Sequence, residues 1–293
     1  MDKELKVSYE YCERVARKQA KNFYYAFTVL PQQKRAAICA VYAFMRFCDD
    51  ISDSDNPCHS KIEALNRWRD ALDAAVAGDF SSSKIMPAFH NAVHSFNIPT
   101  EYFHELIDGA EMDLSINRYR TFDDLYKYCY RVASVVGLVC IHIFGFNEEK
   151  AKEYAEYQGI AFQLTNILRD VKEDADRNRI YIPQSDIEAY GYSEIDLVNG
   201  VYDDRFRALM KAQVERARDF YHKGSPILGM IDPSSRGGLA AMTDIYSSIL
   251  NRIESKNYDV FAKRISLTTS EKLAIAARSI FFGRSDASDS FNR

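Results

Sequence analysis

Two clusters of carboxylate side chains stand out because each falls on one face of a predicted helix. In the first, the segment AAICAVYAFMRFCDD ends in aspartates, and Tyr42, Arg46, Asp49 and Asp53 are separated by four, three and four residues. At about 100° per residue, these spacings place the four side chains on one narrow stripe. An aromatic ring, a cation and two carboxylates therefore lie along one line.

The second cluster lies in AFQLTNILRDVKEDADRNRIYIP and follows a similar pattern. Gln163, Asn166, Asp170 and Asp174 are spaced by three, four and four residues, and Arg177 continues the line. The same helix carries an apolar stripe about 100° around from the polar line. This stripe is formed by Tyr157, Ala161, Leu164, Leu168 and Val171. The polar line thus borders the predicted core instead of facing away from it.

This pattern favours a divalent metal ion bound between the two helices. Two carboxylates one helical turn apart repel each other, and apolar surroundings add a desolvation cost that a cation removes. Mg²⁺ is typically bound by one or two carboxylates together with substrate phosphate oxygens and water. A single pair of this kind is usually a solvated face. Two aligned pairs beside apolar helix predict a diphosphate held through Mg²⁺, with Mn²⁺ as the alternative ion.

Helices must supply the scaffold for these side chains. The chain has 293 residues, 47% of them hydrophobic, and only 12 glycines and 7 prolines interrupt stretches rich in good helix formers. We expect helices over residues 8–29, 32–52, 61–77, 84–95, 99–117, 121–145, 147–176, 203–224, 236–255 and 269–282. No linker or repeat divides them, so residues 1–283 are predicted to form one helical domain, followed by a polar, disordered tail at 284–293.

Charge and cysteine content argue against several other classes of protein. The net charge of −4 provides no basic surface for a phosphate backbone, so nucleic acid is not an expected partner. The six cysteines form no CxxC pair and are expected to be free thiols. The charged N-terminus lacks the apolar core of a secretory signal, and the apolar run at Val132–Phe146 is shorter than a membrane span and predicts a buried helix. We therefore expect a cytoplasmic protein.

Diphosphate chemistry of this kind also needs a dry, aromatic pocket. A metal-held diphosphate is a stabilised leaving group, and the other fragment then departs as a carbocation. Aromatic rings attract such a cation by about 0.5–2 kcal/mol each. The 18 phenylalanines and 19 tyrosines can supply this lining, as in FYYAF at 23–27 and YKYCY at 126–130, although most of the rings are expected to be ordinary core.

Six motifs follow one another along the chain. They are FYYAFTVLP at 23–31, YAFMRFCDDISD at 42–53, MDL at 112–114, YCYRVASVVG at 128–137, QLTNILRDVKED at 163–174 and RNRIYIP at 177–183. In this order and spacing they resemble the squalene and phytoene synthase family, from Phe23 to about Arg264. The resemblance implies an all-α, single-domain isoprenoid synthase fold, the class I terpenoid synthase architecture, with a central cavity.

The resemblance also implies a head-to-head condensation of two isoprenoid diphosphates. In this family one substrate ionises, its cation attacks the double bond of the second, and proton loss gives a cyclopropylcarbinyl diphosphate. Members then release it, reduce it to squalene with NADPH, or rearrange it to phytoene. The sequences of the FYYAF and VASVVG motifs are more similar to those of bacterial hopanoid-pathway enzymes of this family. We therefore expect two farnesyl diphosphates to give presqualene diphosphate. Phytoene synthesis from two geranylgeranyl diphosphates, towards carotenoids, is the alternative, and NADPH use stays open.

Site residues follow from the same resemblance. It implies metal binding by Asp49, Asp53, Asn166, Asp170 and Asp174. It implies substrate binding by Tyr42, Arg46, Gln163, Arg169, Tyr246 and Arg264. Tyr128 matches a tyrosine of the first half-reaction, with proton removal as its expected role and pyrophosphate as the competing base. Where relatives usually carry serines, this chain has Ala20, Lys21 and Asn22, and Lys21 is expected to compensate as a cation.

Other functions stay open from the sequence. Asp49, Asp50 and Asp53 also read as DDxxD, which suits head-to-tail chain elongation or class I terpene cyclisation. The YCYRVASVVG and RNRIYIP segments argue against both. A non-catalytic lipid-binding helical protein is a further alternative, although it would not need both aspartate clusters. Greasy substrates predict peripheral contact with the inner face of the membrane, and downstream pathway enzymes are candidate partners.

Overall fold

Long helices dominate residues 3–20 and 23–288, the part of the chain that the computed structural model describes. They are α1 (Lys3–Gln19), α3 (Gln32–Ser52), α4 (Cys58–Val76), α5 (Met86–Ser95), α6 (Glu101–Ser115), α7 (Phe122–Cys129), α8 (Val135–Phe144), α9 (Ala151–Asp176), α12 (Asp204–Gly224), α14 (Pro233–Ser255) and α15 (Thr269–Ser288). The short ones are α2 (Phe23–Phe27), α10 (Gln184–Ala189), α11 (Glu194–Val198), α13 (Ile227–Met230) and the π-helical turn η1 (Tyr130–Ser134). Because no strand occurs in these residues, the predicted all-α class is confirmed.

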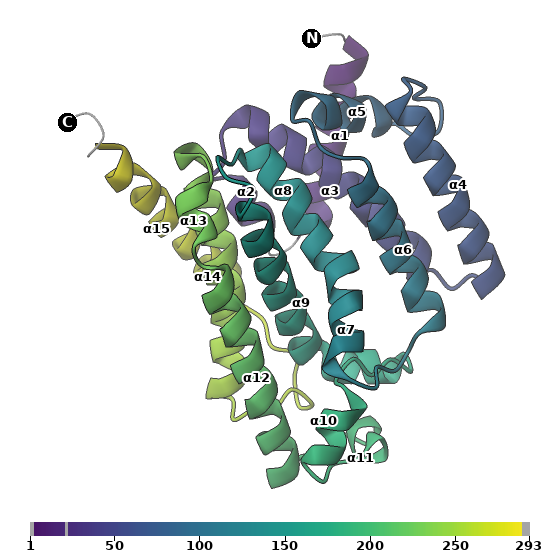
Figure 1. Cartoon of the computed structure of the whole chain (residues 1–293), viewed down its shortest axis with the longest axis vertical. Helices are drawn as coiled ribbons and strands as arrows, with labels where there is room; N and C mark the ends of the chain where they lie inside the picture. The colour runs from purple at the N-terminus through teal and green to yellow at the C-terminus, as the bar shows by residue number, and fades with distance from the viewer. Residues whose placement is uncertain (1–2, 21–22, 289–293) are drawn as a thin grey trace.

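Helix α9 lies at the centre of the bundle (Figure 1). It packs against η1 and α8 on one side and against α12 and α14 on the other. Helices α1, α3, α5 and α6 share one apolar core with α8, while α7, α9, α12 and α14 share a second. Phe23 and Phe162 contact both cores, so the space between the two cores is where a cavity can form.

Two glycines set how closely α9 approaches the preceding helix. A Cβ atom on Gly159 would lie 2.5 Å from Cα of Ser134, and one on Gly137 would lie 2.8 Å from the carbonyl oxygen of Ala155. Any side chain at either position would push the helices apart. The π-helical turn at Tyr130–Ser134 sits at this contact, and the hydroxyl of Ser134 donates to the carbonyl oxygen of Glu156 at 2.9 Å.

The predicted helices differ from the observed ones in several places. The helix predicted over 8–29 is wrong, because α1 packs on α3 and α5 whereas α2 packs on α14 and α15, and one straight helix cannot do both. Residues 147–150 precede α9 instead of opening it, and α15 continues beyond residue 282. The helices α10, α11 and α13 were not predicted because they are too short to show a periodic pattern. Residues 289–293 of the predicted tail lie outside the described part.

The apolar run that predicts a buried helix forms η1 and α8. The segment Phe122–Phe144, which covers most of this run, is long and apolar enough by length and composition to cross a membrane, and half of its most apolar stretch is buried. Within the bundle, α8 packs against α3, α6 and α9. Val136, Gly137 and Cys140 of α8 are not fully buried and line an internal cavity. The helix therefore serves as a wall between the core and that cavity.

Candidate active site

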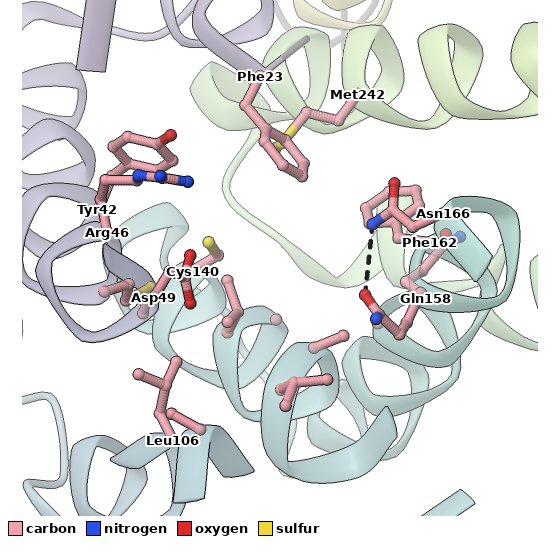
Figure 2. A pocket seen from close by; sticks show the side chains of 18 of the residues that line it. Phe23, Tyr42, Arg46, Asp49, Leu106, Cys140, Gln158, Phe162, Asn166 and Met242 are labelled. Carbon is pink, nitrogen blue, oxygen red and sulfur yellow. Dashed lines mark hydrogen bonds between the residues drawn. The ribbon is translucent and has the colours of Figure 1, made fainter. Parts of the chain in front are cut away.

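A cavity of about 410 Å³ lies between the two apolar cores. Its walls come from α3, α6, η1, α8, α9 and α14 (Figure 2). The C-terminal ends of α3, α6 and α9 contribute charged side chains at one end, which we call the mouth. The first halves of α3, α9 and α14 and the end of α8 contribute Ile38, Phe144, Ala155 and Leu239 at the other end, which we call the floor. The cavity thus has a polar mouth above an apolar interior.

The first predicted polar line occupies one wall of the mouth. Tyr42, Arg46, Asp49 and Asp53 all line the cavity, as their spacing on α3 predicts. Arg46 pairs with the carboxylate of Asp50, and its Nε atom is buried without a hydrogen-bond partner. A buried N–H group without a partner is costly, so an anion that entered the mouth would meet a donor ready to bind it.

The second predicted polar line occupies the opposite wall. Gln163, Asn166, Asp170 and Asp174 on α9 line the same cavity. The amide of Asn166 donates to Oε1 of Gln163 at 3.3 Å, while Oδ1 of Asn166 is buried without a partner (Figure 2). The structure therefore brings both predicted clusters to one mouth, and the amide oxygen of Asn166 is available to a cation.

Two carboxyl groups in the mouth have raised pKa values. Burial, and then the neighbouring carboxylates Asp53 and Asp113, raise the pKa of Asp49 to about 7 against the opposing effect of Arg46. The Asp49 residue is nevertheless exposed at the mouth, which moderates the effect of burial on its pKa. Burial and Asp170 likewise raise the pKa of Asp174 to about 7. Each wall therefore carries a carboxylate whose charge is poorly compensated, and a bound cation would remove that cost.

Asp170 differs from them because it is held by two arginines. Burial alone would raise its pKa, but hydrogen bonds and charge from Arg169 and Arg264 outweigh burial and lower it. Nε of Arg169 donates to Oδ1 of Asp170 at 2.8 Å, and Nε of Arg264 donates to the same oxygen at 2.9 Å. The predicted substrate ligands Arg169 and Arg264 thus reach the site through Asp170 instead of lining the cavity.

A metal ion fits this mouth only in company with a substrate. Within the described residues, no three His, Cys, Asp or Glu side chains gather closely enough to hold a metal on their own. Mg²⁺ usually binds through one or two carboxylates and completes its shell with phosphate oxygens and water. Facing carboxylates and the unpartnered oxygen of Asn166 match that requirement. The predicted ligands are Asp49 and Asp53 on one wall and Asn166, Asp170 and Asp174 on the other, and these are the residues that would hold Mg²⁺ together with a diphosphate.

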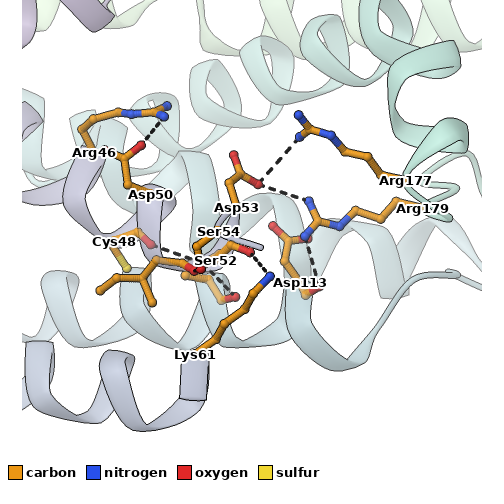
Figure 3. A network of polar contacts seen from close by, with 12 residues as sticks. Arg46, Cys48, Asp50, Ser52, Asp53, Ser54, Lys61, Asp113, Arg177 and Arg179 are labelled. Carbon is orange, nitrogen blue, oxygen red and sulfur yellow. Dashed lines mark hydrogen bonds and ion pairs between the residues drawn. The ribbon is translucent and has the colours of Figure 1, made fainter. Parts of the chain in front are cut away.

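Two arginines of the RNRIYIP segment close the mouth. Arg177 and Arg179 lie 3.8 Å and 3.6 Å from Oδ1 of Asp53 (Figure 3). Both line the cavity. The helical spacing of the second polar line predicts that Arg177 lies on the same wall as Asp170 and Asp174. Arg179 comes after the end of α9, so helical spacing could not predict its position. Their charge at the mouth suits a diphosphate, which carboxylates alone would repel.

Tyr128 belongs to a hydrogen-bonded group that the sequence pattern reveals only in part. Its hydroxyl donates to Asp113 at 3.0 Å, and the hydroxyl of Tyr181 donates to the other oxygen of Asp113 at 2.8 Å. The rings of Tyr128 and Tyr181 stack with centroids 5.1 Å apart. Burial raises the pKa of Asp113, and Arg179 and the two tyrosines oppose that rise. Asp113 and Tyr181 lie in the MDL and RNRIYIP motifs, which was the only signal that could have found them.

Tyr246 and Lys21 are the remaining predicted substrate ligands. Tyr246 packs beneath the wall, with its ring 5.1 Å from that of Phe23 and 4.9 Å from that of Phe162, both of which line the cavity. It therefore supports the wall and is not among the lining residues. Lys21 lies outside the described residues.

The helical bundle, its deep cavity and the two aspartate-bearing walls define an enzyme of the isoprenoid synthase class. The family profile described as squalene/phytoene synthase matches residues 16–271. The chain therefore belongs to the squalene/phytoene synthase family, and it is a prenyltransferase that condenses its substrates head to head.

Individual relatives agree on the family and differ in the substrate that their names imply. The 15-cis-phytoene synthase of Synechococcus elongatus is 38% identical over 281 residues, which cover 92% of this chain and 91% of that protein. The phytoene synthase of Mycobacterium tuberculosis is 38% identical over 280 residues, covering 94% and 92%. Among solved structures, a dehydrosqualene synthase bound to a ligand matches with a TM-score of 0.88 and 28% identity, covering 96% of this chain and 98% of its own.

A squalene synthase from Alicyclobacillus acidocaldarius also has a similar structure. It matches with a TM-score of 0.82 and 27% identity, covering 88% of this chain and 97% of its own. These two solved structures are named for squalene-type products, whereas the sequence relatives are named for phytoene. The family is therefore shared by all of them, and the comparison does not select one substrate.

Proposed function

We propose that this enzyme joins two farnesyl diphosphates into presqualene diphosphate, with Mg²⁺ bound between the walls of the mouth. The observation that carries the proposal is that Asp49 and Asp174 lie on opposite walls of one cavity with an apolar interior. Each of these carboxylates has a negative charge that the protein compensates poorly. Bound Mg²⁺ would supply Lewis-acid stabilisation of the departing diphosphate. Such stabilisation has no use in a protein that only stores lipid.

The residues of the mouth have distinct roles in this reaction. Arg46, Arg177 and Arg179 bind the diphosphate oxygens and hold the reacting carbon below them. The carbon–oxygen bond of one substrate breaks, and pyrophosphate leaves with the bonding electron pair. The double bond of the second substrate then attacks the allylic cation, and loss of one proton closes the cyclopropane ring. Released pyrophosphate is one base for that proton. Tyr128 is the other, because its oxygen can accept the proton while its own hydroxyl proton passes to the carboxylate of Asp113, to which it is hydrogen-bonded.

The interior of the cavity keeps the cation away from water. Phe23 and Phe162 line it with aromatic faces, and Val136 and Met242 add aliphatic surface. Aromatic faces attract a cation by about 0.5–2 kcal/mol each, and more where water is excluded. The same walls would hold the isoprenoid tails extended towards the floor. The enzyme is proposed to work in the cytoplasm, in peripheral contact with the membrane that receives its greasy products.

The direct test is product analysis with purified protein. Farnesyl and geranylgeranyl diphosphate are incubated separately with Mg²⁺, with and without NADPH, and extracted products are identified by mass spectrometry. A thirty-carbon cyclopropyl diphosphate from farnesyl diphosphate supports the proposal, and squalene formed only with NADPH would extend it to the reductive step. No coupled product from either substrate would overturn it.

A second candidate is phytoene synthesis from two geranylgeranyl diphosphates. The observation in its favour is that the sequence relatives at 36–38% identity are named phytoene synthases. The same mouth would serve this reaction, because both substrates carry the same diphosphate. Phytoene from geranylgeranyl diphosphate, without product from farnesyl diphosphate, would establish this candidate instead.

A further inference from the structure

The floor of the cavity contains a polar side chain for which the proposed reaction has no use. Gln158 lies on the cavity face of α9, one helical turn from Ala155. Only 4% of its surface is exposed, and its Oε1 atom is buried without a hydrogen-bond partner. The lining of the same cavity includes the apolar side chains of Ile141, Ile227 and Leu239. An unpartnered buried amide costs about 1–3 kcal/mol, so its presence here calls for a role.

Helix geometry gives the depth at which Gln158 lies. With a rise of about 1.5 Å per residue, Gln158 is about 12 Å, and Ala155 about 16 Å, below Asn166 along α9. An extended peptide backbone covers about 3.5 Å in three bonds, which is about 1.2 Å per bond. We use the same advance per bond for an extended isoprenoid chain. The twelve-carbon main chain of a farnesyl group therefore reaches about 13 Å and the sixteen-carbon main chain of a geranylgeranyl group about 18 Å. For a tail that starts level with Asn166 and runs along α9, a farnesyl chain would end beside Gln158, and a fourth isoprene unit would need the space of its side chain.

Neighbouring helix α12 keeps Gln158 from moving aside. A Cβ atom on Gly224 would lie 2.8 Å from Cγ of Gln158 and 3.0 Å from its backbone nitrogen. The two helices are thus in close contact at this point, and the absence of a side chain on Gly224 is what lets Gln158 fit between α12 and the cavity. A longer tail cannot displace Gln158 in the direction of α12, so the amide acts as a fixed wall.

We propose that Gln158 limits the length of the isoprenoid tail and sets a preference for farnesyl over geranylgeranyl diphosphate. The inference rests on the proposed function, because it concerns the substrate of the same site. Replacing Gln158 by alanine removes four heavy atoms from the floor, close to the five carbons of one isoprene unit. Replacement by leucine keeps a side chain of similar length.

The test compares kcat/KM for the two diphosphates in the full-length enzyme with Mg²⁺. The ratio of geranylgeranyl to farnesyl turnover is expected to rise about tenfold or more in Gln158→Ala, and to stay within about threefold of wild type in Gln158→Leu. Gln158→Ser provides a second shortened variant if Gln158→Ala folds poorly. Gln213→Leu is the matched control, because Gln213 is equally buried on α12 but is bonded to Asp186 at 2.9 Å and does not line the cavity. It should lower the melting temperature and leave the substrate ratio unchanged.

Three results with active wild-type enzyme would overturn the inference alone. They are equal turnover of both diphosphates by wild type, an unchanged ratio in both shortened variants, and a Gln158→Leu ratio that rises as much as that of Gln158→Ala. The last result would assign the effect to polarity instead of length. A wild-type protein that makes no coupled product from either diphosphate would instead overturn the proposed function, and the inference with it.

Discussion

The four predicted aspartates of the mouth, Asp49, Asp53, Asp170 and Asp174, fall into two kinds that their sequence motifs do not distinguish. Asp53 and Asp170 lie beside arginines, Asp53 near Arg179 and Asp170 against Arg264. For Asp49 and Asp174, no arginine or lysine within the described chain comes within ion-pair distance. Burial raises the pKa of each of these two to about 7.

Each wall therefore offers one carboxylate already neutralised by protein and one that is not. The unpaired carboxylate on each wall is where a divalent cation gains most, because the protein has left its charge uncompensated. The paired ones hold arginines close to the place where a diphosphate would bind. The mouth thus holds two unpaired carboxylates, where a cation gains most, and two paired carboxylates whose arginines attract the diphosphate.

The largest effect is expected from removing the unpaired charges. Asp49→Asn and Asp174→Asn should each lower kcat/KM by about a thousandfold, since a metal ligand contributes several kcal/mol to stabilising the leaving group. Steady-state kinetics at saturating Mg²⁺ measures the loss. Asp176→Asn is the matched control, because Asp176 is exposed at the end of the same helix, and it should change kcat/KM by less than about twofold. Full activity in Asp174→Asn would contradict the assignment.

Thermal stability should separate the two kinds of aspartate. Asp174→Asn removes a charge that burial penalises, so the melting temperature of the unliganded protein should rise by a few degrees at pH 8. Asp170→Asn leaves Arg169 and Arg264 without their carboxylate and should lower the melting temperature by about 2–8 °C, for a loss of about 1–2 kcal/mol at about 2–4 °C per kcal/mol. Differential scanning fluorimetry without metal measures both. If both substitutions changed the melting temperature by the same amount in the same direction, the two kinds of aspartate would not differ in charge compensation, and the account would be wrong.

The pH dependence of stability follows from the raised pKa values of Asp49 and Asp174. Their folded-state pKa values lie above those of the unfolded chain, so the folded state binds more protons between about pH 4 and 7. The contribution of these groups to stability is therefore larger at pH 5 than at pH 8. The wild-type melting temperature should fall between those values in the absence of metal, and the fall should be smaller in Asp174→Asn. The same slope in both proteins would contradict the pKa assignment.

The smallest effect is expected at another carboxylate of the mouth, Asp113, which two tyrosines hold by hydrogen bonds. Tyr181→Phe removes one of these bonds while Tyr128 keeps the other. A single hydrogen bond of about 1 kcal/mol predicts a fivefold to tenfold loss in kcat/KM. Tyr128→Phe, measured alongside, should lose more, because the proposed reaction gives the Tyr128 hydroxyl a role in receiving the proton. A larger loss in Tyr181→Phe would mean that Tyr181 itself contacts the reacting groups.

Helical periodicity predicted the walls of the site but not their electrostatics. The four, three and four spacing of Tyr42 to Asp53 is a property of α3 alone, so it could be read before the fold was known. The pairing of Asp170 with Arg264 joins residues far apart in the chain, and nothing in the local pattern announces it. Local spacing therefore identified which side chains share a wall, and tertiary contacts decided which of them keep an uncompensated charge.

The same limit explains the errors in the fold. Long amphipathic helices such as α9 and α12 were predicted because many turns repeat the apolar pattern. The break between α1 and α2 was missed because both segments are good helix formers, and only their packing against different partners separates them. Gln158 showed no signal either, since a single glutamine on a helix is unremarkable until the neighbouring helix and the cavity are known.

The central claim is that the two walls bind a diphosphate through Mg²⁺. Isothermal titration calorimetry with a non-hydrolysable farnesyl diphosphate analogue tests it most directly, in wild type and in Asp49→Asn, with Mg²⁺ and with EDTA. We predict binding that is at least a hundredfold tighter with Mg²⁺ in wild type, and that loses most of this dependence in Asp49→Asn. Equal affinity of the wild-type protein in Mg²⁺ and in EDTA would contradict the claim.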